Sequence, residues 1–165
     1  MKIQIFLTGG TIDKHYVQAN GKMDFADSHI ADILEQGRNR SDIDIDTVVF
    51  KDSLQMDDTD RELIARQCNE ATAEKIVITH GTDTMAQTAA HVAKSYPDIV
   101  TEKTIVFVGA MIPHEISYSD ATFNMGFALG AVNCLPSGIF ITMNGRIFDW
   151  DKVQKNLALG EFETV

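Results

Sequence analysis

The sequence predicts an α/β fold with a doubly wound, mainly parallel sheet. Short apolar runs alternate along the chain with longer segments whose apolar residues recur at helical spacing. The short runs are apolar throughout, which is typical of strands buried on both faces. With 165 residues, 44% of them hydrophobic, the chain is long enough to bury one core. We therefore expect a single three-layer domain over residues 1–165, Rossmann- or flavodoxin-like, with helices on both faces of the sheet.

The expected elements follow one another as repeated strand–helix units. Strands are predicted at residues 2–7, 46–50, 75–79, 103–110 and 137–143, the last of these being the final strand. Helices are predicted at 27–40, 58–72, 83–96 and 120–135, with a final helical turn at 150–157. Asp27 or Ser28 is expected to cap the first helix, and Asp58 or Thr59 to begin the second. Pro97 ends the third helix.

Four predicted strands end in unusual loops. These are TGGT (8–11), HGTDT (80–84), GAMIP (109–113) and MNGR (143–146). Right-handed crossovers place the carboxyl ends of parallel strands at one edge of the sheet. Because ligands of open α/β sheets bind outside those ends, this edge is the expected site.

The turn at Gly9–Gly10 leaves backbone N–H groups pointing outward, and two chemistries fit it. One is phosphate binding. The other is attack on a carbonyl by an activated threonine hydroxyl, with backbone amides stabilising the oxyanion. The phosphate interpretation is the weaker one, because TGGTID lacks both the Gly-Lys-Ser/Thr ending of a P-loop and the third glycine of GxGxxG.

The second turn places a hydroxyl and a carboxylate together, at Thr82 and Asp83. Asp83 is equally suited to cap a helix at 84–96, and the two roles are compatible. A lone histidine at a strand end, such as His80, is more often structural, so it is left out of the catalytic set. A lysine can act as a base when burial favours its neutral form. Lys152 and Lys155 are the candidates, and each also fits an ordinary exposed lysine.

Composition narrows the class of partner. The formal net charge of −10 argues against nucleic acid and anionic membranes. Cys68 and Cys134 form no CxxC pair and indicate thiols in a reducing compartment, so we expect a cytoplasmic location without a signal peptide or a membrane span. The histidines show no ligand spacing on a shared element, so no metal site and no cofactor are expected; they are at positions 15, 29, 80, 91 and 114.

Taken together, these motifs resemble the bacterial-type L-asparaginases, the asparaginase/glutaminase family. TGGTI (8–12), THGTDTM (79–85) and VGAM-P (108–113) carry the resemblance, which continues through SDATFN (119–124) and MNGRIFDWDKVQKN (143–156). It covers nearly the whole chain. TGGTI and HGTDTM in this order, on these strands, are highly specific.

The resemblance implies a function and a set of site residues. Thr11 would attack a side-chain amide, ammonia would leave, and water would hydrolyse the acyl-enzyme. Lys155 fits the spacing from Met143–Asn144 better than Lys152 does. The implied catalytic residues are Thr11, Thr82, Asp83, Lys155 and Tyr16. The implied substrate-binding residues are Gly10, Ser53, Gly81, Thr82, Asp83 and Ala110, with Ser53 on the substrate carboxylate and Asp83 on its ammonium group.

The chain also departs from the family pattern. Family members carry a C-terminal domain, which is expected to be absent here. Tyr16 follows Thr11 more closely than the family tyrosine does. Leu54 replaces a polar substrate contact, Ile112 replaces an arginine, and Ala121–Thr122 replaces Gly-Pro. The departures indicate a rebuilt substrate pocket.

Three hypotheses follow, and the first is preferred. It is an amidohydrolase acting on asparagine or a related small amide. The second is an amino-acid-binding or regulatory module with little or no turnover, and the third is nucleotide binding by analogy of fold alone. Self-association into a dimer or tetramer is expected to supply missing pocket walls. The small-residue segment GFALGAV (126–132) suits close helix packing, either in the core, which is the preferred interpretation, or at a subunit contact.

Overall fold

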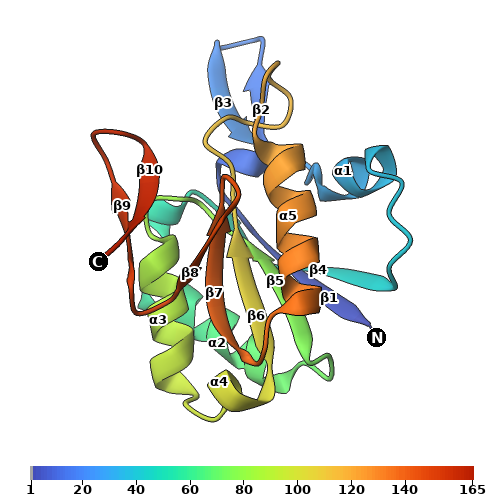
Figure 1. Ribbon diagram of the computed structural model, residues 1–165. Helices are drawn as coiled ribbons and strands as arrows, with labels where there is room; N and C mark the ends of the chain where they lie inside the picture. Colours follow the sequence, from blue (N-terminus) through green and yellow to red (C-terminus); the bar gives the residue numbers. More distant parts are fainter. Residues whose placement is uncertain (1) are drawn as a thin grey trace.

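The computed structural model describes residues 2–165, which form one α/β domain (Figure 1). The strands are β1 (Ile3–Gly9), β2 (Lys14–Val17), β3 (Lys22–Phe25), β4 (Ile43–Lys51), β5 (Lys75–Thr79), β6 (Thr104–Val108), β7 (Gly138–Met143), β8 (Arg146–Asp149), β9 (Val153–Asn156) and β10 (Glu161–Thr164). The helices are α1 (Ile30–Gln36), α2 (Asp58–Glu70), α3 (Met85–Ser95), α4 (Ile99–Glu102) and α5 (Ala121–Cys134). Two short 3₁₀ helices lie at Thr11–Asp13 and Ser53–Gln55.

The central sheet has six strands in the order β4-β1-β5-β6-β7-β8. All neighbouring pairs are parallel except β7 and β8, which are antiparallel. The predicted mainly parallel, doubly wound sheet is therefore confirmed. The chain passes from β1 to β4 on one side and later to β5 on the other side, so the strand order reverses between β1 and β5. This switch point is where open α/β sheets bind ligands.

Alternate residues of each central strand enter two different cores. On β5, Ile76 and Ile78 pack with one core and Val77 with the other. The first core lies between the sheet and α2, α3 and α4, and the second between the sheet and α1 and α5. Because both faces are covered, the side chains on both faces are mainly apolar, which explains the continuous apolar runs.

The helix starts differ in detail from the prediction. Helix α1 begins at Ile30 after His29, so the prediction of Asp27 or Ser28 as its N-cap is wrong. Ser28 Oγ still accepts a hydrogen bond from the Ile30 N–H, at 3.2 Å. Helix α2 begins at Asp58 as predicted, and the preceding Asp57 caps it through a reciprocal capping box.

Two further corrections concern hairpins. The strand at 137–143 is not the last one, and the predicted helical turn at 150–157 is wrong, because β9 pairs there with β10. A pattern of buried and exposed side chains explains why strands form here. Val153 and Phe162 are buried while their neighbours are more exposed, and Gly160 turns the chain between the two strands at φ +66°. A second hairpin, β2–β3, occupies 14–25, where no element was predicted.

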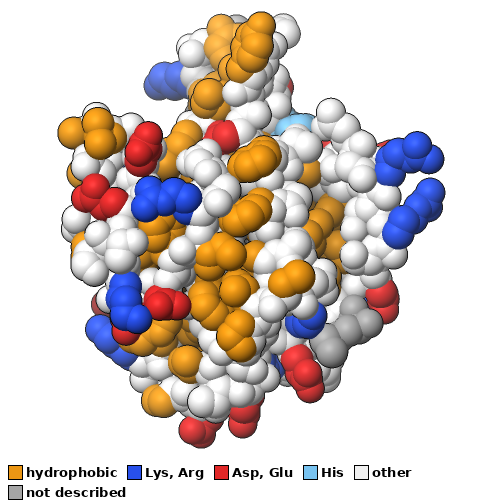
Figure 2. Space-filling model, viewed as in Figure 1, with side chains coloured by type: hydrophobic (Ala, Val, Ile, Leu, Met, Phe, Trp, Pro, Cys, Tyr) orange, Lys and Arg blue, Asp and Glu red, His pale blue; other side chains and the backbone are white. Residues whose placement is uncertain are grey.

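Apolar side chains also gather on one outer face, over α5 and the adjoining strands β7 and β8 (Figure 2). Phe123 is 61% exposed and stacks on Phe127 with 6.4 Å between ring centroids, while Ile147 on β8 is 44% exposed.

No helix within residues 2–165 combines the length and apolar character that a membrane crossing requires.

Candidate functional site

The ends of β1 and β5 meet through the backbones of Gly10 and Gly81. Gly10 and the preceding Gly9 adopt φ values of +89° and +87°, a conformation that favours glycine. A Cβ atom on Gly10 would lie 2.3 Å from the Gly81 nitrogen, far inside van der Waals contact. The two Gly–Thr turns are therefore in direct contact, at the switch point of the sheet.

The loop after β4 closes the other side of this contact. A Cβ atom on Gly81 would lie 2.5 Å from Ser53 Oγ, so Ser53 packs directly against the second turn. Thr84 Oγ1 donates a hydrogen bond to the Ser53 carbonyl oxygen at 2.9 Å, and the Gly10 N–H donates to the Lys51 carbonyl at 3.3 Å. Three strand ends thus hold one another in place.

Lys155 reaches this site from β9 and contacts both candidate residues of the second turn. Its Nζ donates to Thr82 Oγ1 at 2.7 Å and pairs with Asp83 Oδ1 at 2.6 Å. Thr82 is 5% exposed and the Lys155 side chain 15% exposed, so these two residues are largely withdrawn from water, whereas Asp83 is open to solvent. Lys152, the alternative lysine, pairs instead with Asp149.

The interpretation of Asp83 as a helix cap is wrong. Helix α3 begins at Met85 after Thr84, and the capping position makes no side-chain hydrogen bond. The Asp83 carboxylate pairs with Lys155 instead. The Asp83 carboxylate is therefore engaged by Lys155 and not by the start of the helix.

The end of β6 closes the floor beneath Thr82. A Cβ atom on Gly109 would lie 2.5 Å from the His80 carbonyl oxygen and 3.3 Å from Thr82 Cγ2, so only glycine allows this approach. Ala110 follows it and is fully buried. Buried Asn124 donates to the Gly109 carbonyl at 3.0 Å, which fixes this strand end against α5.

Asp120 and Asn124 organise the loops that follow β6 and β7. Asp120 accepts hydrogen bonds from the backbone N–H groups of Met111 and Ile112, both at 3.0 Å. Asn124 Oδ1 accepts from the Asn144 N–H at 3.0 Å. These residues carried no individual role in the sequence interpretation, although the motifs SDATFN and MNGR contain them. Their partners lie on two separate loops, so a local sequence pattern does not reveal that they form one network.

The two remaining predicted residues lie on the segment after β1. Thr11 follows Gly10 directly, begins the 3₁₀ helix at Thr11–Asp13 and is partly exposed. Tyr16 lies on β2 and is 49% exposed. Its hydroxyl lies 3.8 Å from where a Cβ atom on Gly21 of the same hairpin would be, and its N–H donates to the Glu115 carboxylate at 3.3 Å. The roles of both residues stay predictions.

The fold and the site together define a doubly wound α/β domain with a threonine–aspartate–lysine set at its switch point. A family model described as "Asparaginase, N-terminal" matches residues 2–161. The chain belongs to this family, as the motifs predicted.

Individual relatives agree with that assignment. L-asparaginase from Thermococcus kodakarensis is 32% identical over 174 residues, covering 100% of this chain and 51% of the relative. Its solved structure matches with a TM-score of 0.87 at 29% identity, over the same shares of the two chains. Glutaminase-asparaginase from Acinetobacter glutaminasificans is 36% identical over 112 residues, 61% of this chain and 32% of the relative. The structure of a probable cytoplasmic L-asparaginase from Campylobacter jejuni matches with a TM-score of 0.76 at 27% identity, over 99% of this chain and 51% of the other. The chain spans at most about half the length of these relatives.

His80 joins β5 to the site and is fully buried. Its Nδ1 lies 2.8 Å from the Gly81 carbonyl oxygen, which can only accept, so Nδ1 carries the proton. Burial lowers the pKa of the imidazole from 6.5 to about 4, and the charge of Arg61 acts in the same direction. His80 is thus a buried, neutral residue at neutral pH.

The His80 pKa predicts a pH dependence of stability. Because the unfolded chain binds this proton more readily than the folded chain, the His80 contribution is complete above pH 6.5 and decreases as the pH falls toward 4. We expect the difference in free energy of unfolding between wild type and His80→Gln to shrink by about 3 kcal/mol from about pH 7 to about pH 4. Urea unfolding at several pH values measures this. A difference that stays constant across the range would contradict the buried, neutral assignment.

Proposed function

We propose that the protein is an amidohydrolase of the asparaginase kind, releasing ammonia from L-asparagine or a related small amide. The observation that carries the proposal is the Lys155 contact with both Thr82 and Asp83, at 2.7 and 2.6 Å. Lys155 lies more than seventy positions from either residue along the chain. Lys155 is largely buried and its charge is met by Asp83 and Thr82, and the three residues lie at the strand ends where open α/β sheets bind ligands.

In this proposal Thr11 is the nucleophile. Its Oγ forms a bond to the amide carbon, the hydroxyl proton passes to a base, and the C–N bond breaks as the amide nitrogen takes a proton and leaves as ammonia. Water then adds to the ester carbon and releases the acid with Thr11 restored. Thr82 and Lys155 are suited to carry these protons, because Lys155 Nζ is hydrogen-bonded to Thr82 Oγ1.

The remaining predicted residues would bind the substrate. Asp83 is 36% exposed at its side chain, so its carboxylate can meet a substrate ammonium group while holding Lys155. The contact between the turns brings the backbones of Gly10 and Gly81 to the same place as Ser53. Backbone N–H groups there would stabilise the oxyanion. Ala110, on the buried floor, completes the proposed binding set, whereas Tyr16, on the hairpin, belongs to the proposed catalytic set.

Two further properties stay proposals. A cytoplasmic location is supported by the similarity to the probable cytoplasmic L-asparaginase of Campylobacter jejuni and by two free cysteines, Cys68 and Cys134. Self-association is supported by the apolar outer face around Phe123 and Ile147.

The proposed nucleophile is tested by ammonia release from L-asparagine, L-glutamine and a panel of small amides. Thr11→Ala should lower the rate by at least about 10³-fold, because it removes the attacking oxygen. Thr72→Ala, an exposed threonine before β5 at the opposite edge of the sheet, is the matched control and should retain the wild-type rate. No ammonia from wild type, with an amino acid bound in calorimetry, would favour the binding-module hypothesis instead.

The lysine assignment has its own matched pair. Lys155→Met should lower the rate by about 10²–10⁴-fold, the range that general acid–base groups contribute. Lys152→Met removes the exposed pair with Asp149 and should leave the rate unchanged. Equal rates in the two variants, measured on folded proteins, would remove Lys155 from the mechanism.

A further inference from the structure

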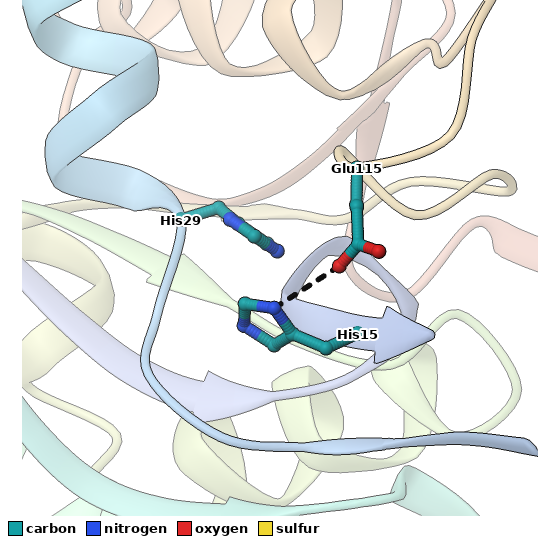
Figure 3. A group of neighbouring side chains, drawn as sticks. All are labelled: His15, His29 and Glu115. Atoms are coloured by element: carbon teal, nitrogen blue, oxygen red, sulfur yellow. Dashed lines mark ion pairs between the residues drawn. The ribbon is translucent and has the colours of Figure 1, made fainter. Parts of the chain in front are cut away.

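Two histidines and a glutamate meet beside the candidate site, on segments far apart in the sequence. His15 lies on β2, His29 directly precedes α1, and Glu115 lies in the loop between β6 and α5. One ligand atom from each lies within 4.8 Å of the other two. Figure 3 shows the three side chains pointing toward one another. The proposed hydrolysis uses none of them.

The orientation of His15 leaves one ring nitrogen facing the cluster. Its Nε2 lies 2.7 Å from the Asp27 carbonyl oxygen, which can only accept, so Nε2 carries a proton. Its Nδ1 lies 3.1 Å from Glu115 Oε2 (Figure 3). A ring lone pair and a carboxylate oxygen repel each other at this distance, so a proton or another cation must lie between them.

The buried ring nitrogen of His29 favours a metal ion over a proton at this position. Its Nε2 is buried and finds no hydrogen-bond partner among residues 2–165, which is uncommon for a buried polar atom. In Figure 3 the nitrogen at the tip of this ring points toward His15 and Glu115. A proton on His15 would satisfy Glu115 and leave His29 without a partner. A metal ion would satisfy all three groups at once.

Neighbouring contacts hold the segments that carry the two histidines. The His29 backbone N–H donates to Asp13 Oδ1 at 3.0 Å, which fixes the start of α1. The contact of the His15 Nε2 with the Asp27 carbonyl oxygen resembles the outer hydrogen bonds by which the second ring nitrogen orients histidine ligands in metal sites.

We propose that His15, His29 and Glu115 bind a zinc ion, with water as its fourth ligand. Two imidazoles and one carboxylate suit zinc, whereas magnesium and calcium prefer oxygen ligands throughout. Zinc ligands lie about 3.4 Å apart in a tetrahedral site, so side-chain shifts of about 1 Å would close the site. The His15 and Glu115 side chains are 27% and 38% exposed, which leaves room for this movement and a path for the ion.

The ion would join three segments, one of which adjoins the amide site. β2 directly follows the 3₁₀ helix that begins with Thr11, so zinc would hold the β2–β3 hairpin against the Glu115 loop and α1. The inference does not depend on the proposed hydrolysis, because binding is measured without substrate.

The test uses the chain without an affinity tag, treated with chelator and dialysed against zinc, followed by metal analysis and thermal melting. Wild type should bind one zinc ion per chain and melt at a higher temperature with zinc. His15→Ala and Glu115→Gln, both partly exposed, should weaken zinc binding by at least about 100-fold and remove the melting shift. His91→Gln is the control, because His91 pairs with Glu62 at 3.0 Å and no further His, Cys, Asp or Glu within residues 2–165 joins them. It should bind zinc as wild type does.

Circular dichroism establishes that each variant is folded before binding is compared. Zinc binding that is equal in wild type and in folded His15→Ala or Glu115→Gln would overturn the proposal. The proposal would also be overturned if wild type bound no zinc, or if His91→Gln lost as much zinc affinity as the two ligand variants. Magnesium binding as tight as zinc binding would overturn it as well.

Discussion

The contact between Gly10 and Gly81 is the constraint on which the candidate site depends. It joins the two strand ends on either side of the switch point without any side chain between them, because a Cβ atom on Gly10 would lie 2.3 Å from the Gly81 nitrogen. Parallel pairing of β1 with β5 brings the strand ends side by side, and the two glycines then allow the turns themselves to touch. Thr11 and Thr82 each follow one of these glycines directly along the chain.

The remaining contacts hold this junction in a single arrangement. Ser53 packs against Gly81 and accepts a hydrogen bond from Thr84, so the loop after β4 is tied to the start of α3. Lys155 reaches the same turn from the β9–β10 hairpin, which lies outside the central sheet. The central sheet therefore positions the two turns, and the β9–β10 hairpin outside the sheet supplies Lys155. A shift of either element would separate Lys155 from Thr82.

Much of this arrangement could be predicted from local pattern. Continuous apolar runs predicted the parallel strands, since a strand covered on both faces needs no polar side. The Gly–Thr turns and their shared edge followed from the topology. Hairpins β2–β3 and β9–β10 were missed because each is short and carries only a weak alternation, as in Val153 and Phe162. Asp83 looked like a helix cap because residue type alone does not distinguish a cap from a partner of a distant lysine. The cluster of His15, His29 and Glu115 was invisible for a related reason: its members meet only after three separate segments have folded together.

The most direct test of this account compares Gly10→Ala with Gly126→Ala by ammonia release and thermal melting. Gly126 lies in α5, where an added Cβ atom meets nothing within 4 Å, so this variant should keep its activity and melt at the same or a slightly higher temperature. Gly10→Ala must separate the two turns, and a displacement of about 1 Å at a catalytic group can cost about 100-fold in rate. We expect a loss of that size in a folded Gly10→Ala protein, together with a lower melting temperature. A Gly10→Ala protein with the wild-type rate and stability would contradict the claim that the contact between the turns builds the site.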